Sequence, residues 1–162
     1  MRRLATLPLL LAACLMLAWS ASPAHAEAEA KVVYHADFAD PRRFSAMLTS
    51  INNMMNHYEN EFIDADVRIV FVAHGIRFLT DDPLEGTPFA EDAALAEQRE
   101  SLRGRLTSLN TVRGVKLELC EITRSEIGVP TEALYPNIEA VPSGVVRIAE
   151  LQQQGFSYLK IE

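Results

Sequence analysis

The chain has 162 residues, and its 15 lysines and arginines against 22 aspartates and glutamates give a formal net charge of −7. A phosphate backbone repels an acidic chain that lacks clusters of basic residues, so the composition argues against a nucleic-acid-binding protein. The length suits a single domain behind a short leader.

The first 26 residues have the pattern of a secretory signal peptide. Arg2 and Arg3 give the positive start, an apolar run follows from Leu4 to Trp19, and Ala24-His25-Ala26 offers the small residues that signal peptidase requires. The run is short for a bilayer span. We therefore expect cleavage after Ala26, a periplasmic or otherwise exported chain over residues 27–162, and no membrane span in it. With two arginines and no acid removed, 13 basic and 22 acidic side chains leave a net charge of −9.

A second interpretation concerns Leu11-Ala12-Ala13-Cys14, which resembles a lipobox and would make Cys14 a lipidated N-terminus. The apolar run continues after Cys14, where a lipoprotein normally turns polar, so the cleaved leader is favoured. Cys120 is then the only cysteine of the mature chain. An intramolecular disulfide is excluded, and Cys120 is either a packed, inert side chain or a reactive thiol.

The first half of the mature chain predicts strand, helix, strand and helix. Residues 31–36 are prone to form a strand, and Asp40 as N-cap with Pro41 in the first turn starts a helix. Residues 67–73, largely apolar, resemble a central parallel strand. A loop from Asp81 to Ala90 has a length that suggests mobility or function. One stripe of the first helix is apolar: Phe44, Met47, Leu48, Ile51, Met54, Met55 and Tyr58.

The second half continues the alternation. A helix from about Glu91 to Asn110 is expected to end at Gly114, with Leu95, Leu102, Leu106 and Leu109 inward and its arginines outward. Residues 115–119 predict a strand that terminates at Cys120, and an irregular segment leads to a strand over 138–141. Pro142-Ser143-Gly144 opens a last helix over 145–154, and residues 156–161 form the closing strand. This order predicts an α/β fold with a mainly parallel sheet covered on both faces.

Three polar side chains follow the predicted strands: Asp37, His74 and Cys120. In an open parallel sheet, sites form in the crevice beyond the carboxyl ends of the strands, so these residues are expected to converge. Backbone N–H groups after a strand end would lower the pKa of a thiol. Glu121 would oppose this effect and Arg124 would offset Glu121. His74 is either a loop histidine bound to the backbone or a base beside Cys120.

Other chemistries have weaker support. Met47, Met54 and Met55, with His35, His57 and His74, would suit copper, but the methionines fall on the apolar stripe of a helix, where methionine fills the core. Asp37-Phe38-Ala39-Asp40-Pro41 holds no glycine to cradle a phosphate. We therefore expect no metal and no cofactor.

Three stretches have a recognisable pattern: Val72-Ala73-His74-Gly75, the strand from Gly114 to Cys120, and Val141 to Lys160. In these stretches the chain resembles the DsrE/DsrF-like family of small sulfur-relay proteins. It implies a three-layer α/β/α sandwich of about five strands, assembly into trimers or hexamers, and a cysteine that carries persulfide sulfur. By position, that cysteine is Cys120.

The sequence therefore predicts a periplasmic sulfur-handling protein in which Cys120 accepts and passes sulfane sulfur, helped by His74 and nearby N–H groups. Asp37, Gly75 and Arg124 are candidate binding residues at the same crevice. We expect a carrier more than a turnover enzyme, with a sulfur donor or acceptor protein as partner. The alternative is a non-catalytic oligomeric binding module with Cys120 packed in its core.

Overall fold

The computed structural model describes residues 28–162. The predicted signal peptide, the lipobox that ends at Cys14 and the cleavage site after Ala26 lie outside these residues. No helix within residues 28–162 is long and apolar enough to cross a bilayer.

A five-stranded sheet with the order β4-β3-β2-β1-β5 forms the centre of the domain. All four neighbouring pairs are parallel, which confirms the predicted parallel sheet and its five strands. The bounds of the strands are β1 (Ala30–Ala36), β2 (Ala65–Phe71), β3 (Lys116–Cys120), β4 (Ile138–Val141) and β5 (Ser157–Leu159).

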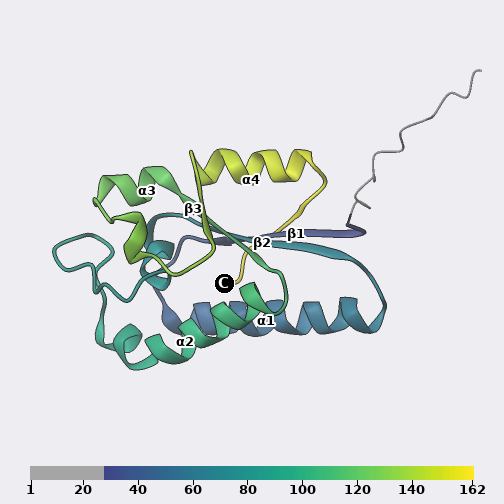
Figure 1. Cartoon of the computed structure of the whole chain (residues 1–162), viewed down its shortest axis with the longest axis horizontal. Helices are drawn as coiled ribbons and strands as arrows, with labels where there is room; N and C mark the ends of the chain where they lie inside the picture. Colours follow the sequence, from purple (N-terminus) through teal and green to yellow (C-terminus); the bar gives the residue numbers. More distant parts are fainter. Residues whose placement is uncertain (1–27) are drawn as a thin grey trace, which may run out of the picture.

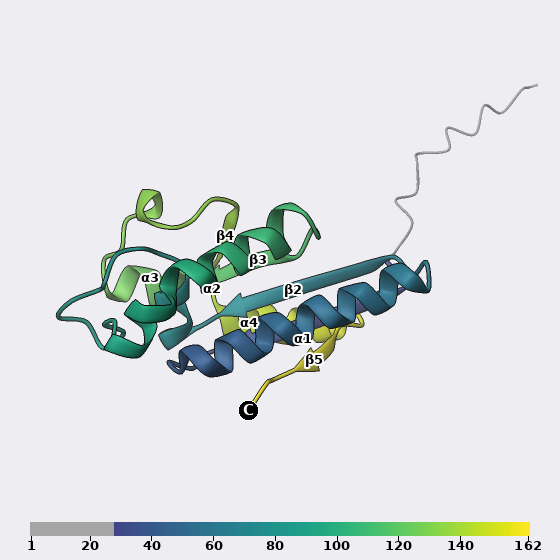
Figure 2. The same ribbon diagram turned by 90° about the horizontal axis from the view of Figure 1, so that it is seen from below.

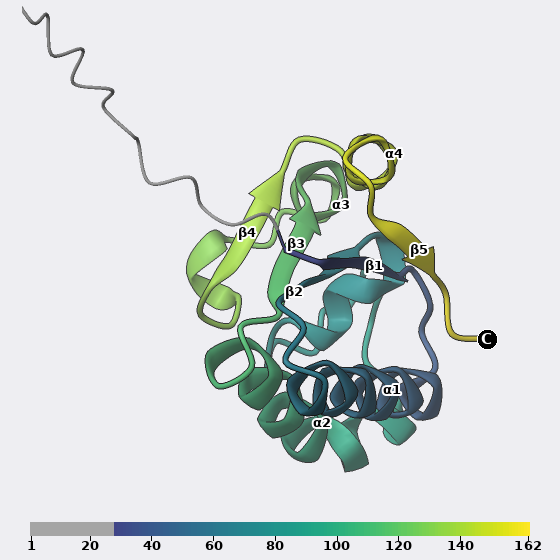
Figure 3. The same ribbon diagram turned by 90° about the vertical axis from the view of Figure 1, so that its right-hand side faces the viewer.

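Helices cover both faces of the sheet and confirm the three-layer α/β/α sandwich. Figure 1 shows α1 (Pro41–Asn60) and α2 (Ala93–Thr111) on one side, with the short α3 (Glu121–Glu126) and α4 (Gly144–Gln153) on the other. Figure 2, from below, shows α1 and α2 beside each other, and Figure 3 shows the three layers along the strands. Two 3-10 turns, η1 (Ala73–Phe78) and η2 (Thr131–Ala133), connect the elements.

The two faces of the sheet are packed unequally. The larger core lies against α1 and α2, where the predicted stripe of α1 buries Phe44, Met47, Leu48, Ile51 and Met55. The α4 side holds a second, smaller core of Val33, Val70, Ile148, Leu151 and Phe156. Because this side is thinly packed, polar groups have room between α4 and the sheet.

Strand β2 ends earlier than predicted, at Phe71 instead of Ala73. Ala73 takes a positive φ of 49° and turns the chain into η1, which crosses the carboxyl end of β1. Gly75 permits this crossing, because a Cβ atom at position 75 would lie 2.1 Å from the carbonyl oxygen of Ala36. The structure therefore gives Gly75 a packing role at the strand ends.

The long loop before α2 is held to the body of the domain. Leu84 and Phe89 are buried, and Asp81 binds both Arg103 and the Tyr135 hydroxyl. Arg99, expected on the outer face of α2, is half-buried and donates to the carbonyl oxygens of Arg77 and Thr80. These contacts argue against the mobility that its length suggested.

Candidate functional site

Cys120 is the last residue of β3 and the N-cap of α3. Its side chain is only 4% exposed. It lies between the first turns of α3 and α4, because β4 pairs with β3 and its register sets Val141 opposite Cys120. The chain then turns through Pro142 and Ser143 into α4, which brings Gly144 against the cysteine.

Gly144 makes the closest approach to Cys120. A Cβ atom at position 144 would lie 3.1 Å from the Cβ atom of Cys120 and 2.5 Å from Cγ2 of Val72. Only glycine fits here without displacing its neighbours. The N–H group of Gly144 therefore reaches the sulfur from the first turn of α4, whose dipole favours negative charge at this end.

The pKa of Cys120 reflects a competition. Burial raises the pKa of this thiol, while hydrogen bonding by the N–H group of Gly144, by the N–H and hydroxyl groups of Thr123 and by the N–H group of Ile122 lowers it. The second effect prevails, so the pKa lies below the ordinary value of a thiol. The uncharged thiol forms no capping hydrogen bond at the start of α3. We therefore attribute the lowered pKa to N–H groups that face the sulfur atom and stabilise it when it is a thiolate.

Thr123 links the thiol to η1. Its hydroxyl is buried with the rest of the side chain and accepts a hydrogen bond from the N–H group of Ala73 at 3.0 Å. The hydroxyl proton remains to be donated toward Cys120. Ala73 holds a left-handed conformation that costs an L-residue about 1 kcal/mol, and this contact supports it.

Asp37, His74 and Cys120 all lie at the carboxyl ends of the strands, but they do not form one cluster. Asp37 follows β1 and binds Lys160 at 2.9 Å, and the ring of His74 packs edge-on against Phe89. Within residues 28–162, no hydrogen bond, ion pair or ring contact joins any two of Asp37, His74 and Cys120. Their proposed shared role stays a prediction.

Arg124 is occupied within α3. Its Nε donates to Glu121 at 2.8 Å, and Nη1 binds the carbonyl oxygen of Val129. The pair offsets the negative charge of Glu121 next to the thiol, as the sequence suggested. Among residues 28–162, no group of three His, Cys, Asp or Glu residues is arranged to hold a metal ion.

A buried carboxylate lies two residues before the thiol on the same face of β3. Glu118 is fully buried and accepts from Arg68 at 2.9 Å and from Arg147 at 2.7 and 2.9 Å. Burial raises the pKa of Glu118, but hydrogen bonding to both arginines outweighs it and the pKa lies below its usual range. Nothing in the local sequence marks Glu118 as a buried group, because a charged residue on a strand is usually exposed to solvent.

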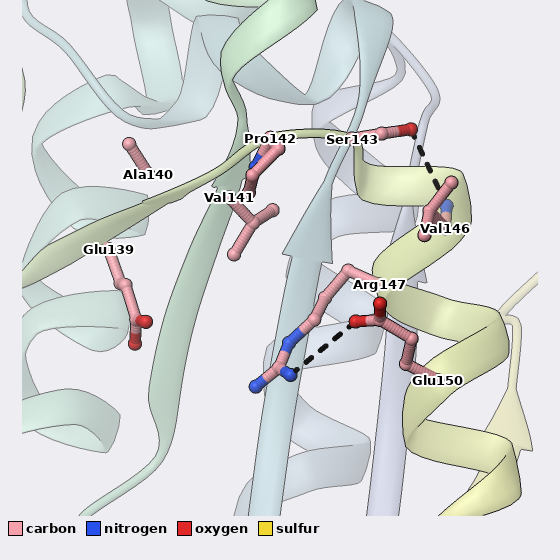
Figure 4. A pocket seen from close by; sticks show the side chains of 8 residues that line it. All are labelled: Glu139, Ala140, Val141, Pro142, Ser143, Val146, Arg147 and Glu150. Atoms are coloured by element: carbon pink, nitrogen blue, oxygen red, sulfur yellow. Dashed lines mark hydrogen bonds and ion pairs between the residues drawn. The ribbon is translucent and has the colours of Figure 1, made fainter.

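A hollow of about 350 Å³ lies beside this cluster, between β4 and α4. Figure 4 shows the residues that line it: Glu139, Ala140, Val141, Pro142, Ser143, Val146, Arg147 and Glu150. The first turns of α3 and α4, whose N–H groups face the thiol, also carry exposed apolar side chains, namely Ile122, Val145 and Val146.

Comparisons with known proteins agree with this fold. The chain is similar to the protein of unknown function MTH1491 from Methanobacterium thermoautotrophicum, with 23% identity and a TM-score of 0.63 over 82% of this chain and 99% of that one. It is also similar to the YchN protein from E. coli, with 19% identity and a TM-score of 0.50 over 81% and 98% of the two chains. The search of curated proteins found no match. The model of the DsrE/DsrF-like family matches residues 30–161, and the chain therefore belongs to that family.

Proposed function

We propose that the protein is a periplasmic sulfur carrier in which Cys120 accepts sulfane sulfur, holds it as a persulfide and passes it to a partner. One observation carries the proposal: the pKa of Cys120 is lowered despite burial, through N–H groups from two helix starts and the Thr123 hydroxyl. These donors favour the thiolate over the thiol, and the thiolate is the form that attacks sulfur. Family membership supports sulfur handling in general.

The chemistry needs only thiolates. In loading, the Cys120 thiolate attacks a terminal sulfur of a polysulfide, and a sulfur–sulfur bond breaks. The shortened polysulfide leaves with the electron pair and takes up a proton, and Cys120 becomes a persulfide. In unloading, an acceptor thiolate attacks the outer sulfur and Cys120 leaves as the thiolate.

Thiolate stabilisation is assigned to Gly144, Thr123 and Ile122, the groups that lower the pKa of Cys120. The role of His74 as a base beside Cys120 needs a separate test, because the ring of His74 contacts Phe89. The export of the protein and its assembly into trimers or hexamers belong to the same proposal, and both rest on the sequence.

The test combines loading with thiol reactivity. Treatment with polysulfide should add the mass of one sulfur atom to the protein and none to Cys120→Ser. The pH dependence of alkylation by iodoacetamide should follow a pKa below the ordinary value of a cysteine thiol. His74→Gln should leave this pKa unchanged.

A thiol that resists both reagents until the protein is denatured would contradict the carrier. The low exposure of Cys120 favours this second candidate, a binding module in which the cysteine only packs.

A further inference from the structure

The open hollow beside β4 is the feature that the proposed chemistry leaves unused. β4 is an edge strand, and α4 packs mainly on β1, β2 and β3. On the α4 side of β4, Val141 is buried and Glu139 is exposed, so this face is open around Glu139. The hollow of about 350 Å³ lies there, large enough for a few side chains of a partner. Val141, Pro142 and Val146 give it apolar walls.

The charged residues around this hollow leave an excess of negative charge. Arg147 binds Glu118 through Nε and Nη2, and its Nη1 lies 4.0 Å from Glu150. Arg68 binds both Glu118 and Asp66, and Lys116 also binds Asp66. These three cations therefore face four carboxylates, namely Asp66, Glu118, Glu139 and Glu150. Glu139 forms no ion pair within the described chain. Figure 4 shows Glu139 and Glu150 on opposite sides of the hollow with Arg147 between them.

The apolar walls and the carboxylates of the hollow together indicate which kind of partner it can bind. Apolar walls between two carboxylates complement an apolar side chain flanked by lysine or arginine. A second copy of the chain would bring the same carboxylates, within a mature domain whose net charge is −9. The free edge of β4 also offers unpaired backbone groups, which an extended segment can meet.

The geometry points to this hollow as the docking site of the protein that exchanges sulfur with Cys120, through an extended segment that carries an apolar residue beside lysine or arginine. The inference rests on the proposed function. Val141 in the wall of the hollow is the strand partner of Cys120, and Ser143 directly precedes Gly144. A segment seated here therefore lies next to the thiol and can bring its own cysteine to it.

The transfer step follows from this placement. The thiolate of the docked segment attacks the outer sulfur of the Cys120 persulfide, and a new sulfur–sulfur bond forms on the segment. The bond between the two Cys120 sulfurs breaks, and its electron pair stays on the Cys120 thiolate, which the N–H groups of Gly144 and Thr123 stabilise. No external oxidant or reductant is needed.

The test uses two synthetic peptides as probes. Each has one cysteine and two leucines; one adds two lysines and the other two glutamates. The protein, expressed from the 162-residue sequence, is loaded with polysulfide, and sulfur transfer is followed by the mass of each peptide. We expect the lysine peptide to accept sulfur about tenfold faster at low salt, with the preference falling as salt rises.

Matched variants locate the effect. Glu139→Gln with Glu150→Gln should remove most of the preference, while Glu97→Gln with Glu100→Gln, which makes the same charge change on α2, should keep it. Transfer to the small neutral thiol 2-mercaptoethanol should be equal in all of them. An equal preference in both double variants would overturn the docking site. A change of oligomeric state confined to Glu139→Gln with Glu150→Gln, measured by light scattering, would assign the hollow to a second copy and overturn it too.

Docking and sulfur loading can fail separately. A lysine peptide with serine in place of cysteine should bind Cys120→Ser as tightly as wild type, measured by fluorescence anisotropy, and bind the Glu139→Gln, Glu150→Gln protein about tenfold more weakly. If the wild type cannot be loaded but this binding pattern holds, the carrier function fails and the surface stands. If loading succeeds and the pattern is absent, the docking site is wrong.

Discussion

A Cβ atom at position 144 would lie 3.1 Å from the Cβ atom of Cys120, so the first turn of α4 is in direct contact with the carboxyl end of β3. Because of this contact, the pKa of the thiol depends on the position of α4 on the sheet. A change at Gly144 therefore affects stability and thiol chemistry together.

Gly144→Ala should test this link. The new methyl group meets Val72 at 2.5 Å and must displace α4, which we expect to cost about 2 kcal/mol of unfolding free energy and to raise the thiol pKa. Denaturant unfolding and the pH profile of alkylation measure the two effects. Gly104→Ala is the control, since nothing lies within 4 Å of a Cβ atom there and the helix should gain about 0.5–1 kcal/mol. Equal effects of the two variants would refute the contact.

The buried Glu118 should make the stability of the fold depend on pH in the acid range. The pKa of Glu118 lies below that of the unfolded chain, so its ion pairs stabilise the fold above pH about 4.3 and lose this effect as the pH falls through the folded-state pKa. Glu118→Gln should cost about 3 kcal/mol at neutral pH and make unfolding less dependent on acid. Glu97→Gln, on the exposed face of α2, should behave as wild type. Urea unfolding from neutral to acidic pH measures this, and an unchanged acid dependence would contradict it.

His35, near the carboxyl end of β1, should make the stability of the fold depend on pH in a different range. Burial lowers the pKa of His35, although Asp37 opposes this, and Lys160 and Arg43 add to it. Because the unfolded chain takes up the proton first, stability should decline as the pH falls below about 6.5. His35→Gln should weaken this decline in the melting temperature, whereas His57→Gln on the exposed face of α1 should retain it. A wild-type slope in His35→Gln would count against burial as the cause.

The N-caps of α1 and α2 should contribute different amounts to the free energy of unfolding. Asp40 caps α1 by accepting from the N–H group of Arg42, and Asp92 caps α2 while also binding the buried Arg77 at 2.9 Å. Asp40→Ala should cost about 1 kcal/mol, the usual value of a cap. Asp92→Ala should cost about 3 kcal/mol, because it also leaves a buried guanidinium without its carboxylate. Equal losses in chemical denaturation would show that the Arg77 pair adds nothing.

Local patterns in the sequence predicted most of the fold. Asp40 with Pro41, the stripe of α1 and the four leucines of α2 all depend on neighbours in the chain, and all were confirmed. Helix α3 was missed because it spans only Glu121–Glu126. The end of β2 was misplaced because the turn at Ala73 depends on contacts with Thr123, which lies 50 residues away.

The surroundings of the thiol were less predictable. The Pro142-Ser143-Gly144 signal gave the start of the last helix, but only the pairing of β4 with β3 brings Gly144 to Cys120. Asp37 was expected in a shared crevice, yet its partner Lys160 comes from the C-terminal segment. The order of the strands in the sheet decides which distant residues come into contact, and no local sequence pattern encodes that order.

The strand order also has a consequence for how the domain matures. Among the strands of residues 28–162, β1 is the first in the chain, and one of its two neighbours, β5, is the last. During synthesis the edge of β1 toward β5 stays unsatisfied until almost the entire polypeptide has been released, so completion of the sheet waits for the C-terminal residues.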